Sequence, residues 1–117
     1  MSKLTDISAN KVKGKKLTAS VNRPFIASFR HKLHKGFRLD NLEKKDIQTL
    51  QKFLDMASDL TVSQMDSMYR RPSDKSDIFN GQQVEHYGFS DGFRVHGIYE
   101  EQRFEIIRID PNHKFHK

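Results

Sequence analysis

The segment FRVHGIYEEQRFEIIRIDPNHKFHK, which runs from Phe93 to Lys117, holds two extended stretches on either side of Glu101-Gln102. Both stretches interleave apolar residues with charged or polar ones, as β-strands do. A tight turn at Glu101-Gln102 would join them as an antiparallel hairpin. This turn predicts three cross-strand pairs: Tyr99–Phe104, Gly97–Ile106 and Val95–Arg108.

The two faces of this hairpin differ in character, because paired residues share a face. One face is apolar, and we expect helices to contact it; it carries Phe93, Val95, Tyr99, Phe104 and Ile106. The other face is mixed and carries Arg94, His96, Ile98, Ile107 and Ile109. Arg94 and His96 are two residues apart on one strand, so they point to the same side in any register.

Two more strands are expected upstream of the hairpin. In residues 17–30, Phe25, Ala27 and Phe29 alternate with their neighbours in an extended pattern that predicts a first strand. Residues 83–89, QVEHYGF, predict another strand. They follow a loop that contains the turn pair Asn80-Gly81. With the hairpin, these segments supply four strands.

Two helices separate the first strand from the others. Residues 40–60, DNLEKKDIQTLQKFLDMASDL, have apolar residues at helical spacing and predict a helix with Asp40 as its N-cap. Thr61 and Gln64 form a capping-box pattern, which predicts the start of a second helix. This helix is expected to end at Arg71, before Pro72.

The resulting order of elements is β-α-α-β-β-β. It predicts an α+β fold in which two helices pack on a small antiparallel sheet. A chain of 117 residues suits one such domain, expected at residues 17–117. Residues 1–16 lack sustained periodicity and are expected to form a basic, flexible arm.

Composition excludes several kinds of site. The chain has no cysteine, which excludes disulfides, cysteine-ligated metals and a thiol nucleophile. The histidines at 86, 96, 113 and 116 lack the short spacings of metal ligands, so neither a metal nor another cofactor is expected. No apolar run approaches the roughly 20 residues of a membrane span. No signal peptide is recognisable, and a cytoplasmic protein that does not contact membranes is expected.

Charge is distributed unevenly along the chain. Residues 1–39 hold ten Lys and Arg and one acidic residue, whereas residues 40–117 hold eleven and fourteen. This asymmetry indicates a polyanion or an acidic protein as partner, although a lysine-rich arm also occurs as a solubilising tail. The cluster RHKLHKGFR, residues 30–38, directly follows a predicted strand, so we expect it to form a binding surface. Its candidate RNA-binding residues are Arg30, Lys32, Lys35 and Arg38.

The arginine and histidines of the last segment suit chemistry on RNA. The guanidinium of Arg94 offers a planar fork for phosphate oxygens, and the imidazoles of His96 and His113 can transfer protons near neutral pH. Together these groups are candidates for cleaving a phosphodiester without a metal. Four neighbours are candidates for RNA contact: His86, Tyr87, Arg108 and Lys114. The alternative interpretation is structural, with hydrogen-bonded histidines, Tyr87 in the core and Arg108 at a sheet edge or paired with an acid.

The order of elements from about Phe25 onward resembles that of the RelE/YoeB-like bacterial toxins, which are small mRNA endonucleases. Residues match only over 93–116: Arg94 at the start of a strand, a short turn, the strand 104–109, and then His113. By this resemblance Arg94 would stabilise the scissile phosphate, and His113 would act as the acid or base. The chain departs from the pattern in its Asp110-Pro111-Asn112 insertion, its basic arm and its lack of a terminal His-Tyr pair.

The leading hypothesis is a RelE-like toxin-type protein that binds RNA and cleaves mRNA without a metal. The resemblance implies mRNA, free or on the ribosome, as substrate and a small antitoxin protein as partner. Two alternatives belong to other classes. One is a nucleic-acid-binding module without catalysis, and the other is a small mobile-element regulator or inhibitor that binds an acidic protein.

Overall fold

The structure, a computed structural model, describes residues 22–90 and 92–115. The predicted arm at residues 1–16 lies outside this range. The helical elements are the 3-10 turn η1 (Leu39–Asn41) and the α-helices α3 (Lys44–Ala57) and α4 (Val62–Tyr69). The strands are β1 (Ala27–Ser28), β2 (Arg70–Arg71), β3 (Ile78–Phe79), β4 (Gln82–Gln83), β5 (Glu85–Phe89), β6 (Phe93–Glu100) and β7 (Arg103–Asp110).

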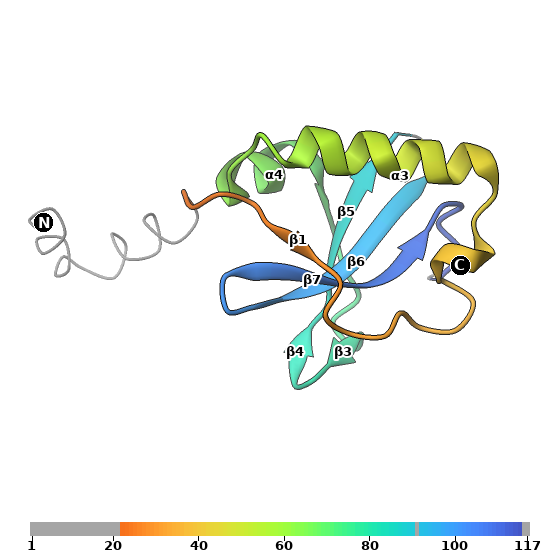
Figure 1. Cartoon of the computed structure of the whole chain (residues 1–117). Coiled ribbons are helices and arrows are strands. Elements are labelled where there is room, and N and C mark those ends of the chain that lie inside the picture. The colour runs from red at the N-terminus through yellow and green to blue at the C-terminus, as the bar shows by residue number, and fades with distance from the viewer. Residues whose placement is uncertain (1–21, 91, 116–117) are drawn as a thin grey trace, which may run out of the picture.

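The fold is α+β, as predicted, with two helices on one sheet of five strands. The strand order is β1-β7-β6-β5-β2, and β3 and β4 form a separate hairpin around Asn80-Gly81. Helices α3 and α4 lie together on one side of the sheet, and the β3–β4 hairpin projects on the other side (Figure 1). We call the side under the helices the helix face and the opposite side the second face.

The sheet is mixed, whereas an antiparallel sheet was expected. Strand β1 pairs in parallel with β7, with Ala27 opposite Phe104, and the other pairs in this sheet are antiparallel. The chain continues along β7 in the same direction: His34 N–H donates to Ile107 O and Ile109 N–H to Phe37 O. A parallel neighbour is possible because both helices lie between β1 and β7 in the sequence, which is connection enough to reverse the chain.

The two capping predictions have different outcomes. At α4, the predicted box is present: the Gln64 N–H donates to Thr61 Oγ1 at 3.1 Å, and the Thr61 N–H donates to Gln64 Oε1 at 2.9 Å. At α3, the prediction of Asp40 as N-cap is wrong, because the N-cap is Glu43. Leu42 has an extended backbone, which separates η1 from α3 and moves the helix start to Lys44.

A β-bulge determines what lies on each face of the hairpin. The predicted pairs Tyr99–Phe104 and Gly97–Ile106 are present, but the register shifts between His96 and Gly97. His96 therefore lies opposite Arg108, and the predicted pair Val95–Arg108 is replaced by Val95–Ile109. The extra residue on β7 returns Ile109 to the helix face and puts Arg108 on the second face.

The hydrophobic core lies between the helices and the helix face. It includes the predicted hairpin residues Phe93, Val95, Phe104 and Ile106, with Ile109 in addition, and Tyr99 packs against it. Helix α3 contributes Leu50, Phe53 and Ala57, and α4 contributes Val62 and Met65. A second, smaller cluster on the other face contains Val84, Ile98 and Ile107. Among the described residues, no helix is both long and apolar enough to cross a membrane.

Candidate functional site

The bulge in β7 builds a polar cluster on the second face, which consists of Asp77, His86, His96 and Arg108. Three of its members come from adjacent strands, since His96 of β6 lies opposite both His86 of β5 and Arg108 of β7. Asp77 comes from the segment just before β3. His86, His96 and Arg108 are 3%, 0% and 1% exposed, so the cluster is interior.

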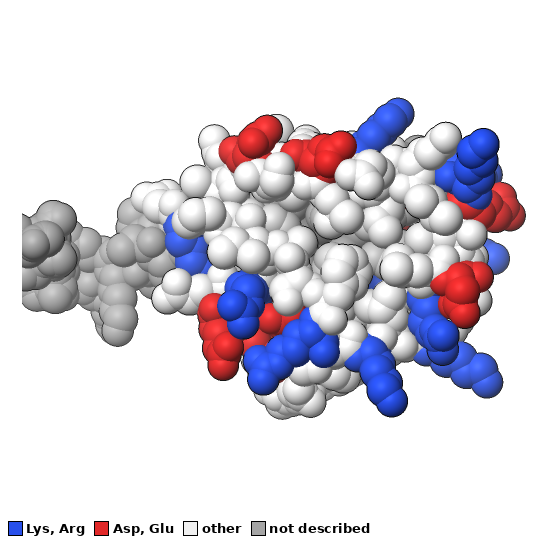
Figure 2. All heavy atoms as spheres, viewed as in Figure 1, with Lys and Arg blue, Asp and Glu red and all other residues white. Residues whose placement is uncertain are grey.

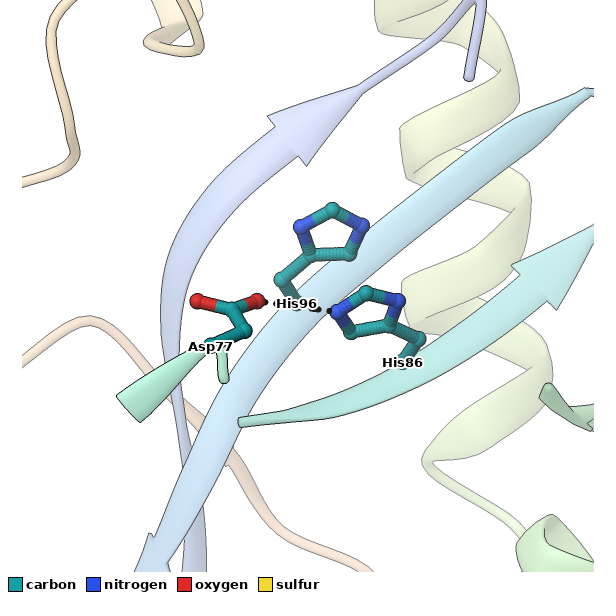
Figure 3. A group of neighbouring side chains, drawn as sticks. All are labelled: Asp77, His86 and His96. Carbon is teal, nitrogen blue, oxygen red and sulfur yellow. Dashed lines mark hydrogen bonds and ion pairs between the residues drawn. The ribbon is translucent and has the colours of Figure 1, made fainter. Parts of the chain in front are cut away.

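Close polar contacts hold the cluster together. Arg108 Nη2 donates to Asp77 Oδ2 at 2.6 Å, and His86 Nε2 lies 3.2 Å from the same oxygen. The rings of His86 and His96 are stacked, with centroids 3.8 Å apart and planes 12° from parallel. Figure 3 shows the carboxylate of Asp77 beside the two imidazoles. The buried guanidinium thus has a carboxylate partner, which a buried charge requires.

Two aromatic residues and a third histidine border this cluster. The Phe115 ring lies over the Arg108 guanidinium at 3.6 Å and contacts His96 edge-on at 5.7 Å. Phe79 contacts the ring of His34 at 5.5 Å. The segment after β7 and the β3–β4 hairpin therefore both help to cover the second face.

The pKa values of Asp77 and His34 are both lowered in the fold, but by different causes. Burial alone would raise the pKa of Asp77, but hydrogen bonds from Arg108 and His86 hold it below its ordinary value. The pKa of His34 is lowered, first by burial and then by the nearby positive charge of Arg108, which outweigh the attraction of Asp77. The fold therefore favours an ionised Asp77 and a neutral His34.

Asp77, His86 and His96 are also the one trio of possible metal ligands in the part of the chain that the structure describes, with ligand atoms within 4.8 Å of one another. Their geometry does not fit a metal ion. Imidazole lone pairs lie in the ring plane, and the two stacked rings define parallel planes, so one ion at the usual distance of about 2.0–2.1 Å cannot lie in both. Asp77 is also already paired with the positive charge of Arg108, which a metal ion would have to displace or repel. In this arrangement hydrogen bonds join Asp77 to Arg108 and His86, and His96 stacks on His86.

Arg94 and His113 lie at one end of the sheet. Arg94 is half-buried near the start of β6, directly across from Asp110. His113 is exposed in the turn after β7, three residues beyond Asp110. Both are therefore neighbours of Asp110. The third candidate, His96, shares the second face with Arg94 but lies in the polar cluster, covered by Phe115.

The candidate residues of the cluster RHKLHKGFR form a continuous edge of the molecule. We call this segment, Arg30 to Arg38, the basic edge; it holds four Lys and Arg and no acid. It follows β7 through the hydrogen bonds of His34 and Phe37, and its four cationic side chains are exposed. Figure 2 shows Lys and Arg along the lower margin, on the side of the sheet away from α3. Lys114 lies close by, because the adjacent Phe115 packs on Phe37 at 5.5 Å.

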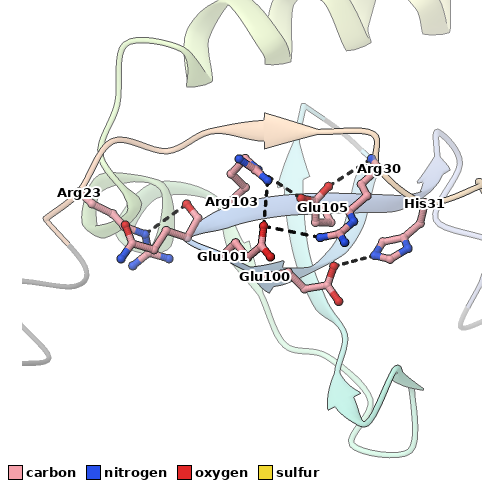
Figure 4. A network of polar contacts seen from close by, with 8 residues as sticks. Arg23, Arg30, His31, Glu100, Glu101, Arg103 and Glu105 are labelled. Atoms are coloured by element: carbon pink, nitrogen blue, oxygen red, sulfur yellow. Dashed lines mark hydrogen bonds and ion pairs between the residues drawn. The ribbon is translucent and has the colours of Figure 1, made fainter.

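Acidic residues neutralise the basic edge only in part. Near the β6–β7 turn, Arg30 pairs with Glu101 at 3.7 Å, and His31 lies 2.7 Å from Glu100 (Figure 4). Arg38 pairs with Asp40 at 3.3 Å. Among the described residues, no ion pair involves Lys32 or Lys35. The middle of the edge is therefore the most electropositive part.

A depression of about 610 Å³ opens beside Lys32. It is lined by Lys32, Leu33, Arg38, Leu39 and Asp40. Leu39 is 48% exposed there, so the depression combines cationic groups with an apolar wall. Of the two cations in the lining, Arg38 is paired with Asp40, which also lines the depression, so among the described residues Lys32 supplies its unpaired positive charge.

Tyr87 lies on the helix face of the sheet, whereas its neighbour His86 lies on the second face. It is fully buried in the core, where its hydroxyl donates to Asp66 at 2.5 Å and lies 2.6 Å from the Tyr99 hydroxyl. Burial raises the pKa of Tyr87 well above its ordinary value. As the structure places them, Tyr87, His86, His96 and Arg108 have almost no surface that RNA could contact.

Three residues of this region were not predicted from the sequence. Asp77 lies in a predicted loop, and nothing local marks it as the partner of Arg108. Arg71 was predicted only as a helix end, but it forms strand β2 opposite His86. Phe115 was not expected to cover the cluster. A signal existed only for Asp77, since a buried arginine requires an acid.

Comparisons of this chain with protein-family models, with curated proteins and with solved structures find no match. Its function is therefore inferred from its own side chains.

Proposed function

We propose that the protein binds RNA through the basic edge, as a RelE-like toxin-type protein. The observation that carries this proposal is the exposed run of cations from Arg30 to Arg38, held along β7 by backbone hydrogen bonds. A cationic segment held by the sheet presents its charges at defined positions, and an RNA backbone carries phosphates at regular intervals. The α+β fold agrees with the toxin class but does not by itself imply a function.

A charge-reversal experiment tests this proposal with a matched control. The variant Lys32→Glu/Lys35→Glu changes the middle of the basic edge, and Lys44→Glu/Lys45→Glu makes the same change in net charge on the exposed start of α3. We expect the edge variant to weaken binding of a single-stranded RNA by about tenfold or more, and the control to weaken it much less. Each lost phosphate contact also lowers the slope of log K against log salt by about 0.7.

Two results would overturn the proposal. One is the absence of RNA binding at moderate salt, and the other is an equal loss in both variants, which would indicate a general effect of net charge. A stable complex with an acidic protein, combined with no RNA binding, would instead support the regulator alternative. Binding measured by fluorescence anisotropy between about 50 and 200 mM salt distinguishes these outcomes.

Metal-independent cleavage of mRNA is a second candidate function. It is favoured by the position of Arg94 and His113, which lie next to the same residue, Asp110, and are both at least partly exposed. In this scheme Arg94 stabilises charge on the phosphate and His113 transfers a proton. His96 is interior and would take part only if Phe115 moved away.

Incubation of the full chain with mRNA, with and without ribosomes, tests the cleavage. The parent protein should cleave mRNA in the presence of EDTA. Arg94→Gln and His113→Gln should each abolish this cleavage, whereas His31→Gln, at the other end of β7, should retain it. Cleavage that persists in both variants, or that EDTA removes, would contradict this second candidate. A preparation that binds RNA but never cleaves it would leave the binding module as the function.

A further inference from the structure

The depression beside Lys32 lies within a loop that the sheet holds in place. The loop is residues 32–40, and in Figure 1 it is part of the orange segment between β1 and α3. Its backbone is pinned to β7 at two points, since His34 N–H donates to Ile107 O at 2.9 Å and Ile109 N–H donates to Phe37 O at 3.0 Å. The Phe37 N–H donates to His34 O at 2.9 Å and closes the turn between these points. The two arms of the loop, residues 32–33 and 38–40, supply the lining of the depression.

Each arm contributes an apolar wall that is fixed before any ligand binds. Leu33, on the first arm, packs against the hydrophobic core. The second arm is braced by a turn, in which Arg38 N–H donates to Asn41 Oδ1 and Asn41 N–H to Arg38 O, both at 3.0 Å. Leu42 N–H donates to Leu39 O at 3.1 Å in the same turn, and the Leu39 side chain stays 48% exposed. The depression therefore offers preformed apolar contacts, which small-molecule sites commonly have.

The polar groups of the depression are an acceptor and a cation. Asp40 Oδ2 accepts a hydrogen bond from Arg38 Nη2 at 3.3 Å, and the Asp40 side chain is 69% exposed. An ionised carboxylate has about four acceptor positions, so Asp40 can take further donors from a ligand. Its bond to Arg38 orients the carboxylate and the guanidinium together. Lys32 adds an exposed positive charge on the opposite arm.

These groups match one kind of ring best. Apolar walls suit a flat ring, a carboxylate suits N–H donors on the edge of that ring, and a lysine suits an attached phosphate. Guanine carries two neighbouring donors, N1–H and the N2 amino group, that point the same way and can bind one carboxylate together. Adenine and cytosine offer a single amino group, and the N3–H of uracil lies between two carbonyl oxygens that a carboxylate repels. Unpaired RNA bases are commonly recognised by their edges in this way and stack on arginine side chains.

We propose that the depression is a guanine-binding site. Asp40 accepts the two N–H donors of the base, and Leu33 and Leu39 contact the ring. The guanidinium of Arg38, held by Asp40, lies beside the base, and Lys32 attracts the phosphate. A free guanine nucleotide and a guanosine within RNA present the same groups. That the guanine belongs to RNA rests on the function proposed above, in which case the basic edge reads one base in addition to binding the backbone.

A change of one group in the ligand tests the site. The probes are a short oligouridine with one central guanosine and the same RNA with inosine, which lacks only the N2 amino group. GMP and IMP are the corresponding free nucleotides. Asp40→Ala removes the acceptor, and Glu101→Gln is the control, because it also removes a negative charge beside an arginine of the basic edge. Fluorescence anisotropy measures RNA binding to the full chain, NMR titration measures the nucleotides, and circular dichroism checks that each variant folds.

We expect the parent protein to bind the guanosine RNA about fivefold more tightly than the inosine RNA, the effect of one hydrogen bond to an exposed carboxylate. Asp40→Ala should bind the two RNAs equally, whereas Glu101→Gln should keep the preference. Loss of either acid strengthens the binding of any polyanion, so the ratio of the two affinities is the measurement that reports on the site. Equal affinity of the parent protein for both RNAs, or a preference that Asp40→Ala retains, would overturn the role of the site in RNA binding.

The free nucleotides separate this site from the proposed function. If both RNAs bind equally, and GMP shifts the backbone amides of Leu33 and Leu39 no more than IMP does, the site does not exist while RNA binding at the basic edge stands. If neither RNA binds but GMP shifts these amides more than IMP does, the proposed function fails and the site stands for a free guanine nucleotide. If neither RNA binds and neither nucleotide shifts the amides, both proposals fail.

Discussion

Gly97 is the residue on which the second face depends. A Cβ at this position would clash with the backbone oxygen of Glu105 and would lie 2.8 Å from Cζ of Phe104. Strands β6 and β7 therefore approach too closely here for any side chain. The register shifts next to Gly97, and the shift turns Arg108 toward His96. The missing side chain at Gly97 thus allows the close approach of the strands next to the bulge that builds the polar cluster.

We predict that Gly97→Ala destabilises the protein by roughly 1–3 kcal/mol, the usual cost of overpacking a core, because the obstacle is a backbone atom that cannot move aside. Gly88→Ala is the comparison, since its obstacles are side-chain atoms of Arg71 and Arg94 and not backbone atoms. Urea unfolding measures both. Equal losses of stability in the two variants would contradict the assignment of the close approach at Gly97.

At the scale of elements, the two helices begin in different ways. Helix α4 has a side-chain cap from Thr61 to the Gln64 N–H. Helix α3 is preceded by the turn η1 and an extended Leu42, so its N-cap is Glu43, three residues after Asp40. A local pattern identified the start of α4 to the residue, although the helix ends at Tyr69 and not at Arg71 as expected. At α3, Asp40 and Glu43 both fit the N-cap position by sequence, and the structure has Glu43 there.

We predict that Thr61→Ala destabilises the protein by about 1 kcal/mol, because the Gln64 N–H then loses its acceptor at the helix start. Thr49→Ala is the control: Thr49 lies inside α3, and its hydroxyl donates back to the Lys45 carbonyl. That bond is not needed by the helix, and alanine is the better helix former. A thermal melt in which Thr49→Ala loses as much stability as Thr61→Ala would contradict the cap.

At the scale of the whole molecule, the sheet separates two environments. The helix face is an apolar core, and the second face combines a small apolar cluster with interior polar groups. His34 of the basic edge lies close enough to Arg108 for that charge to lower its pKa. The basic edge and the polar cluster are therefore coupled through His34.

This coupling predicts a pH dependence of stability. Since the pKa of His34 is lowered in the folded state from 6.5, the unfolded chain binds its proton more readily, and the stabilisation present above pH 6.5 is lost as the pH falls. The lowered pKa of Asp77 acts in the same direction in a more acidic range, below its ordinary 3.8. Thermal melts between about pH 7.5 and pH 5.5 should show the melting temperature falling with pH.

His34→Gln isolates the part of this dependence that belongs to His34. The variant should melt with a smaller change between the two pH values, whereas His113→Gln, an exposed histidine, should keep the slope of the parent protein. A slope that His34→Gln leaves unchanged would assign the dependence to other groups.

The elements were predictable because their signals are local. Alternation around Glu101-Gln102 and the capping pattern at Thr61 depend on neighbours a few residues away, and the hairpin turn and α4 lie where those patterns predicted. The grouping of Arg94 with His96 on one face followed from strand geometry alone. The exposure of these two side chains did not follow from strand geometry, because exposure depends on which other segments cover the face. Phe115 covers His96, and no local pattern predicted that contact.

The amino-acid sequence by itself determined the α+β class, the order of β1, the two α-helices and strands β5 to β7, and the basic edge, because periodicity, caps and charge are properties of short segments. Only the tertiary structure decided that β1 lies parallel to β7, that a bulge turns Arg108 to the second face, and that Asp77 meets it there. These outcomes depend on how strands approach and on which distant segments share a surface. Packing and burial set both, and neither is a property of any segment alone.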